Sequence, residues 1–246
     1  MRPSKKITFK TKVYLLMFIG LPSLSALFLF LEQVTHYEFL FHVAAIPLEI
    51  LLGAFLVKRF LAEKEKEAKR HQLMYIKSFI FRSEMRNLFI ANFSALAYPD
   101  ITIPKIKVSS LQELKTMRSS IDAVKYRSPE DMEAVIEEYV NSHGAFYFFM
   151  DWAIANDFEG IFHDMLYILH FIQDVKLYKK HYPDKLFIEE AKRQPYLMTK
   201  VNQVLQNGII KFLEYAIELK EQRPDMFEEL LADYQISSQA CISRNC

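Results

Sequence analysis

Two long apolar stretches near the start of the sequence constrain the fold more than any other feature. Residues 13–31 read VYLLMFIGLPSLSALFLFL and contain no charged side chain, and residues 39–57 read FLFHVAAIPLEILLGAFLV. A helix of this length crosses the hydrocarbon core of a bilayer, which is about 30 Å thick. The sequence therefore predicts a two-helix transmembrane hairpin over residues 13–58, with the lipid bilayer as its surroundings.

Basic residues predict the orientation of this hairpin. Residues 1–12 are basic, and Lys58 and Arg59 directly follow the second stretch. The connection at residues 32–38 contains no lysine or arginine. Because cytoplasmic flanks of membrane helices are enriched in basic residues, we expect a multi-pass protein of the cell membrane with both termini in the cytoplasm. The alternatives are a signal peptide, which has a shorter apolar region, and a single span followed by a core helix.

One carboxylate lies near the middle of the second stretch. Glu49 is about 14 Å of helix from Lys58, too far for its side chain to reach the membrane surface. An ionisable group at this depth costs on the order of 3 kcal/mol and normally faces protein or a wet cavity. His42 lies on the same helical face, and Ser23 and Ser25 lie at matching depth in the first stretch.

Three hypotheses for Glu49 remain open. It is protonated and hydrogen-bonded within its own hairpin, to a serine or to a carbonyl freed by a proline. It packs against a second copy of the chain without forming a pore. Or several copies surround a water-filled path, where Glu49, His42 and Ser23 are the intramembrane polar groups and the carboxylate selects cations. The third hypothesis requires a homo-oligomer, because one hairpin is too small to enclose a path.

The remaining sequence predicts helices. The five glycines are too few for the many tight turns of a barrel or sandwich. The pattern Ser110-Leu-Gln-Glu113 is a capping box, Ser128-Pro129 places a cap before a helix-starting proline, and Pro224 starts a last helix. The predicted fold class is an all-α membrane protein, with an N-terminal two-helix transmembrane hairpin followed by a cytoplasmic helical bundle.

The domain boundaries follow from the same prolines and capping residues. Residues 59–98 contain no glycine or proline and are expected to form a long linker helix. Prolines and helix caps divide residues 99–236 into successive helices, which are expected to form a cytoplasmic helical domain. Residues 237–246 are polar and are expected to form a flexible tail.

One predicted helix, at residues 157–180, aligns side chains of the kind that bind metal. Glu159, His163, His170 and Asp174 share one narrow face of this helix. A carboxylate and an imidazole four residues apart can hold one metal ion, the only cofactor that the sequence suggests. The alternatives are a plain solvent-exposed face and a pH-sensitive contact.

Other function classes find no support in the sequence. A net charge of +1 gives no reason to expect nucleic acid as a partner. There is no glycine-rich phosphate loop, no GxSxG and no HExxH, so no catalytic residue is assigned and no enzyme is expected. The two cysteines, Cys241 and Cys246, lie too close together to form a disulfide framework.

Two functional hypotheses follow. The first is a homo-oligomeric membrane channel for ion transport, with a cation path near Glu49 and a cytoplasmic helical regulatory domain. The second is a membrane-anchored adaptor or signalling protein whose cytoplasmic helical bundle binds a protein partner or a small ligand.

Overall fold

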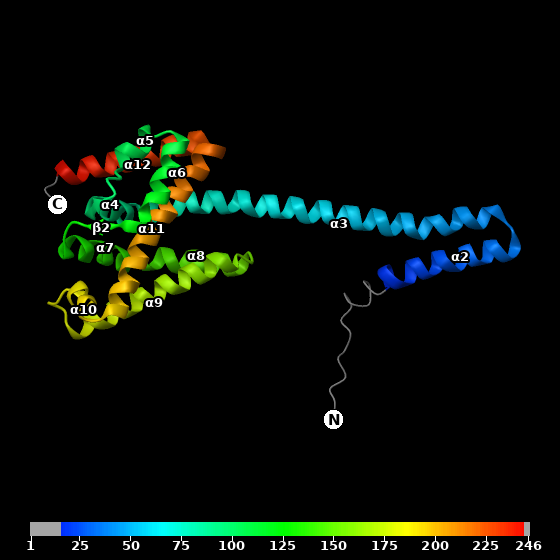
Figure 1. Ribbon diagram of the computed structural model, residues 1–246, viewed down its shortest axis with the longest axis horizontal. Helices are drawn as coiled ribbons and strands as arrows, with labels where there is room; N and C mark the ends of the chain where they lie inside the picture. Colours follow the sequence, from blue (N-terminus) through cyan, green and yellow to red (C-terminus); the bar gives the residue numbers. More distant parts are fainter. Residues whose placement is uncertain (1–15, 244–246) are drawn as a thin grey trace, which may run out of the picture. The chain divides into compact units, whose positions relative to one another are not determined.

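The protein is almost entirely helical, which confirms the predicted all-α class. The computed structural model describes residues 16–243 and is drawn in Figure 1. The helices before the first strand are η1 (Leu16–Gly20), α2 (Leu21–Thr35), α3 (Glu38–Phe79), η2 (Ile80–Glu84) and α4 (Arg86–Ala95). Those after it are α5 (Ile103–Val108), α6 (Leu111–Ser119), η3 (Ser120–Ala123), α7 (Pro129–Asn141), α8 (His143–Ala155), α9 (Glu159–His181), α10 (Phe187–Arg193), α11 (Pro195–Gln222) and α12 (Pro224–Ser243). A short antiparallel pair joins β1 (Leu96–Tyr98) to β2 (Lys125–Tyr126).

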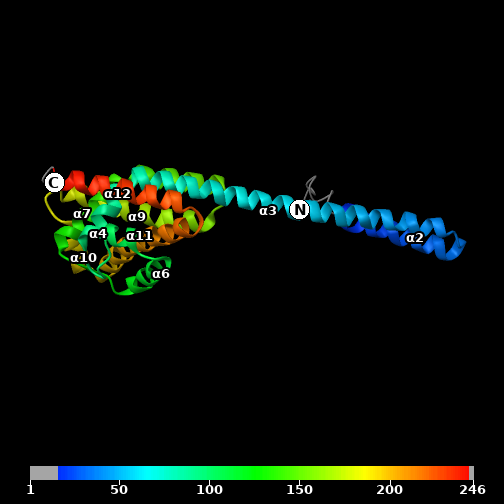
Figure 2. The same cartoon turned by 90° about the horizontal axis from the view of Figure 1, so that it is seen from above.

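The chain divides into two compact units, one up to Gln72 and one from Leu73 onward. We call the second one the helical unit. In the first unit, α2 runs antiparallel beside the beginning of α3, as both views show (Figure 1, Figure 2). The chain reverses at His36, which adopts a left-handed conformation and donates its backbone N–H to Glu32 O at 2.7 Å. Residues 13–15 of the first predicted span lie outside the described residues.

The interface between α2 and α3 is built from small side chains. Ser25 Oγ donates a hydrogen bond to the carbonyl oxygen of Ala44 at 2.5 Å, and both residues are buried. Pro47 is also buried on this side of α3. Small residues let two helix backbones approach closely, so this contact resembles the interfaces that pack helices in a membrane.

Two helices are long and apolar enough to cross a membrane. They are the segments Phe18–Thr35 and Glu38–Glu84. Only 6% and 11% of their apolar windows are buried within the structure. A core helix of a soluble protein would be mostly buried, so these windows are not core helices of the described fold.

The helical unit packs around α11. This helix contacts α4, α6, α9, α10 and α12. Its Phe212 is fully buried, and the rings of Phe89, Phe93 and Tyr234 lie 5.1, 5.1 and 5.3 Å from it. Burial of these rings from α4, α11 and α12 stabilises the packing of the three helices.

The helical unit begins earlier than the predicted boundary at residue 99. Met74, Ile80 and Phe81 are already buried in its core, because the apolar face that starts after Gln72 packs onto α11 and α12. The predicted linker helix is also interrupted. It passes from α3 into the π-helical turn η2 and then into α4.

Residues 237–243 of the predicted flexible tail are helical, and the flexibility of the tail stays a prediction. Helix α12 continues to Ser243, and residues 244–246 lie outside the described part of the chain. Its later turns are held by a contact with α4, where Arg86 Nη1 donates to Ser237 Oγ at 3.0 Å.

The helix starts that were predicted from capping residues and prolines are confirmed. Ser110 and Glu113 form the expected capping box at the start of α6. Ser128 Oγ accepts the backbone N–H of Asp131 at 3.0 Å and caps α7. Pro224 is the first residue of α12. These starts are predictable because each depends on residues within one helical turn.

A buried carboxylate caps a helix that is distant in sequence. Glu133 on α7 is 3% exposed and accepts the backbone N–H groups of Phe187 and Ile188 at 3.0 and 2.9 Å, at the start of α10. Lys179 on α9 completes the site with an ion pair of 2.6 Å. One side chain therefore joins α7, α9 and α10.

A buried polar junction joins α4 and α7 to α11. Tyr139 donates its hydroxyl hydrogen to Val204 O at 3.0 Å, and Asn92 Nδ2 donates to Leu205 O at 2.9 Å. Both donors lie against Gly208, where an added Cβ would stand 2.4 Å from Tyr139 Oη and 3.1 Å from Asn92 Nδ2. Glycine at this position is therefore required by a close approach and not by backbone conformation.

We expect Gly208→Ala to lower the free energy of unfolding by about 1–3 kcal/mol, because the new methyl group displaces the Tyr139 hydroxyl from its hydrogen bond. Helix propensity alone would favour alanine by about 1 kcal/mol. Thermal unfolding of the full chain in one detergent measures the change. Adding Tyr139→Phe, which removes the obstructing oxygen, should recover part of the loss.

The matched control is Gly160→Ala in α9, where a Cβ would meet nothing within 4 Å. It should be neutral or slightly stabilising. Equal effects at the two glycines would contradict the close approach at Gly208.

We expect Glu133→Gln to destabilise the helical unit by about 2–4 kcal/mol, because an amide has one acceptor oxygen in place of two for the backbone N–H groups and leaves Lys179 with only the longer ion pair to Glu137. Glu137→Gln is the control, since Glu137 approaches the same lysine at 3.6 Å from a side chain that is 59% exposed. That variant should lose about 0.5 kcal/mol or less. The comparison of the two melting curves checks the prediction, and similar losses would refute it.

Candidate functional site

Glu49 lies on the face of α3 that is turned away from α2. The buried residues Ala44 and Pro47 mark the side that faces α2. At about 100° per residue, both lie nearly opposite Glu49 around the helix. The Glu49 side chain is exposed, and no residue of the described part of the chain forms a hydrogen bond or ion pair with it.

The other predicted intramembrane polar groups are also exposed. His42 lies two helical turns before Glu49 on the same face of α3. Its ring is edge-on to that of Phe41, with 6.1 Å between the ring centroids. Ser23 is exposed on α2, and it is Ser25 that contacts α3. The structure therefore brings His42 and Glu49 onto one surface and leaves Ser23 apart from them. It does not show the hydrogen bond within the hairpin that was one of the three hypotheses.

The candidate metal ligands on α9 are spread over an exposed face. His163 Nε2 lies 3.7 Å from Glu159 Oε1, and both side chains are more than 60% exposed. Asp174 forms an ion pair with Lys200 at 2.6 Å, and His170 is exposed. Among residues 16–243, no three histidine, cysteine, aspartate or glutamate side chains are grouped to hold a metal ion. The metal site stays a prediction.

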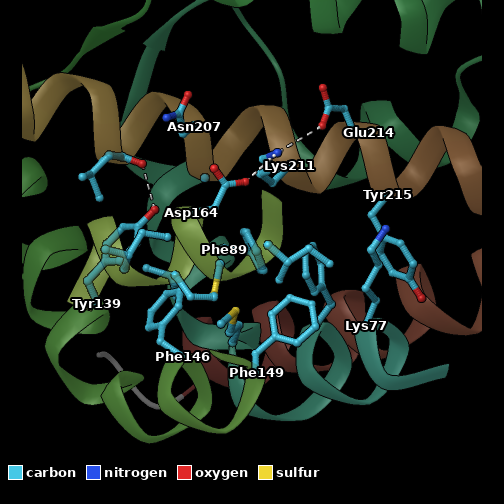
Figure 3. A pocket seen from close by; sticks show the side chains of 18 of the residues that line it. Lys77, Phe89, Tyr139, Phe146, Phe149, Asp164, Asn207, Lys211, Glu214 and Tyr215 are labelled. Atoms are coloured by element: carbon cyan, nitrogen blue, oxygen red, sulfur yellow. Dashed lines mark hydrogen bonds and ion pairs between the residues drawn. The ribbon is translucent and has the colours of Figure 1, made fainter. Parts of the chain in front are cut away.

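The helical unit contains a cavity of about 310 Å³ that sequence reasoning did not find. It lies where α8 and α9 meet α4, α7, α11 and the end of α3 (Figure 3). Its apolar walls are formed by Phe81, Met85, Leu88, Phe89, Tyr139, Phe146, Phe149, Ile161, Met165, Ile168, Val204, Gly208 and Tyr215. Its polar rim is formed by Lys77, Asp164, Tyr167, Gln203, Asn207, Lys211, Glu214 and Glu218.

Ion pairs occupy the charged side chains of the rim. Lys211 on α11 lies 3.1 Å from Asp164 on α9 and 3.9 Å from Glu214 (Figure 3). Lys77 on α3 lies 3.0 Å from Glu218. The Lys211–Asp164 pair links α11 to α9 and the Lys77–Glu218 pair links α11 to α3, so these two pairs of the rim also hold the cavity walls in place.

The two tyrosines of the wall are held in their neutral form. Burial raises the pKa of Tyr139 far above its usual range. Burial also raises the pKa of Tyr215 to about 12, against a smaller opposing effect of the nearby Ser78 hydroxyl. The Tyr215 hydroxyl is buried and has no hydrogen-bond partner among the described residues, so Ser78 does not reach hydrogen-bonding geometry. The walls therefore carry no charge at neutral pH.

Part of the cavity wall is visible in the sequence pattern. The aromatic run at residues 145–152 contributes Phe146 and Phe149 to its wall, and the apolar face of α9 contributes Met165. The pattern of each helix predicts burial but not that a space is left between them. The lining comes from seven elements whose relative placement no local pattern encodes.

Comparison with protein-family models, with curated proteins and with solved structures gives no match to this chain.

Proposed function

We propose that the protein is a homo-oligomeric membrane channel, in which α2 and the apolar part of α3 span the bilayer and the helical unit is regulatory. The observation that carries the proposal is the position of Glu49. It lies near the middle of the more apolar spanning segment, exposed, on the face opposite to α2. Its own hairpin offers it no partner within the described residues.

The free energy of the exposed carboxylate favours a second copy. A carboxylate facing lipid costs on the order of 3 kcal/mol, and burial against protein or water removes that cost. Gly53 lies on the same face as Glu49, and a Cβ there would meet nothing within 4 Å in its own chain. Because glycine has no side chain, a second helix can approach this face closely. Several copies packed by this face would place a ring of Glu49 and His42 side chains around a common axis, where carboxylates select cations.

The proposal includes the orientation of the hairpin in the membrane and the location of the protein in the cell. The basic residues that flank the hairpin favour both termini in the cytoplasm and a multi-pass protein of the cell membrane. The helical unit then lies on the cytoplasmic side. The adjoining part of α3, from Lys58 to Gln72, is exposed and carries charges of both signs, as expected of a helix in water.

A second candidate function is a membrane-anchored adaptor. It is favoured by exposed apolar side chains on α8, where Tyr147, Phe148 and Ile154 are each at least 50% exposed. Such side chains gather where a protein partner binds. In this case the hairpin only anchors the chain, and Glu49→Leu would be neutral or stabilising.

We expect Glu49→Gln to lower cation flux through liposomes by about tenfold or more, because the charge that selects the cation is lost while the side-chain volume is kept. Flux is measured with the full chain at equal protein density. The matched control is Glu38→Gln at the start of α3, which should leave flux close to that of the unchanged protein.

Native mass spectrometry of the same samples gives the number of copies. A closed ring of roughly four or more copies is required to enclose a path. A monomer or dimer, or the absence of flux from the unchanged protein, would overturn the channel and leave the adaptor.

A further inference from the structure

The cavity of the helical unit has the wall chemistry of a small-molecule site. Its floor combines aromatic rings with Met85 and Met165, whose flexible thioethers adapt to different ligand shapes. The volume of about 310 Å³ lies at the lower end of the range for small-molecule sites. Cavities with apolar walls bind apolar molecules, because a ligand makes dispersion contacts with the walls and removes their apolar surface from water.

The rim limits the charge of such a molecule. The pairs Lys77–Glu218 and Lys211–Asp164 occupy both lysines of the rim. Arg118 approaches Glu214 at 2.8 Å from outside the cavity and occupies the remaining carboxylate. A charged ligand would have to break one of these pairs or remain unpaired, and both cost free energy.

The rim does offer a hydrogen-bonding group. Tyr167 on α9 donates its hydroxyl hydrogen to Gln203 Oε1 on α11 at 3.0 Å. The amide nitrogen of Gln203 has no hydrogen-bond partner among the described residues and remains a donor. A single hydroxyl or carbonyl group on a ligand can accept this hydrogen bond while the rest of the molecule fills the apolar walls.

We propose that this cavity binds an uncharged small molecule with an apolar body and one polar end, of the chemical class of a medium-chain alcohol. The proposal concerns the helical unit alone and does not depend on the channel. The volume excludes a whole two-chain lipid, and the paired rim distinguishes an alcohol from the corresponding acid or amine.

The chain carries its own reporter for this site. Trp152 is its one tryptophan. The Trp152 ring stacks on Phe149, a wall residue, with 6.1 Å between ring centroids. A bromine atom brought into the cavity is separated from Trp152 by the Phe149 ring, which is close enough for short-range quenching of the Trp152 fluorescence.

The experiment titrates 11-bromoundecan-1-ol into the full chain held in amphipol, which contains no tryptophan. We expect saturable quenching that unlabelled undecan-1-ol reverses. Undecanoate and undecylammonium should compete about tenfold more weakly or worse, because each brings a charge to a rim without a free counter-charge.

Two variants fill the cavity independently. Ile161→Phe and Met165→Phe each add volume from α9, and each should weaken binding by about tenfold or more. Leu177→Phe is the matched control on the same helix, because Leu177 is 55% exposed and outside the cavity. It should bind like the unchanged protein. Thermal unfolding confirms that each variant is folded, and two filling variants keep the test valid if one is not.

Three outcomes would overturn the proposal. Quenching that rises without saturation and equally in all four proteins would show partition into the amphipol only. Absence of quenching would show that the cavity does not admit the molecule. Stronger competition by the acid or the amine would show that a rim ion pair opens to bind a charge, which contradicts an uncharged ligand.

Discussion

The helical unit depends on two hydrogen bonds to consecutive carbonyls of α11. Val204 O accepts from Tyr139 on α7 and Leu205 O accepts from Asn92 on α4. Both donors are nearly fully buried, so an unmade bond would cost about 1–3 kcal/mol each. Apolar burial brings the helices together but tolerates sliding, whereas these bonds fix one register. Tyr139, Val204 and Gly208 also line the cavity, so the same junction sets the position of its wall.

The hairpin and the helical unit are stabilised in different ways. In the helical unit, large rings fill a common core and charged residues pair at its surface. In the hairpin, the contact between α2 and α3 uses Ser25 and Ala44, and the large apolar side chains point outward. A water-soluble protein would reverse this pattern. The hairpin is thus suited to a surrounding of lipid or of further copies, and Glu49 is the residue that distinguishes between them.

Several features were predictable because they are local. The caps at Ser110 and Ser128 and the helix start at Pro224 depend on a few neighbouring residues. The predicted domain boundary at residue 99 differs from the start of the helical unit at Leu73, because a change from a charged to an amphipathic helix leaves no break in the sequence. The cavity was missed because it is a space between helices. That Glu49 and His42 share a face followed from helical periodicity, but which face meets α2 depended on Ser25 and Ala44, and only the three-dimensional arrangement supplies that.

The π-helical turn η2 sets the rotation of α4 about the helix axis relative to the end of α3. A π-turn corresponds to one extra residue within an α-helix, which offsets the helix on its two sides by about 100°. With this offset, Phe81 enters the core while Arg82 reaches Glu229 and Asp233 on α12 at 2.6 and 2.7 Å. A chain one residue shorter here would lose this alignment, so the length of the turn is constrained as well as its composition.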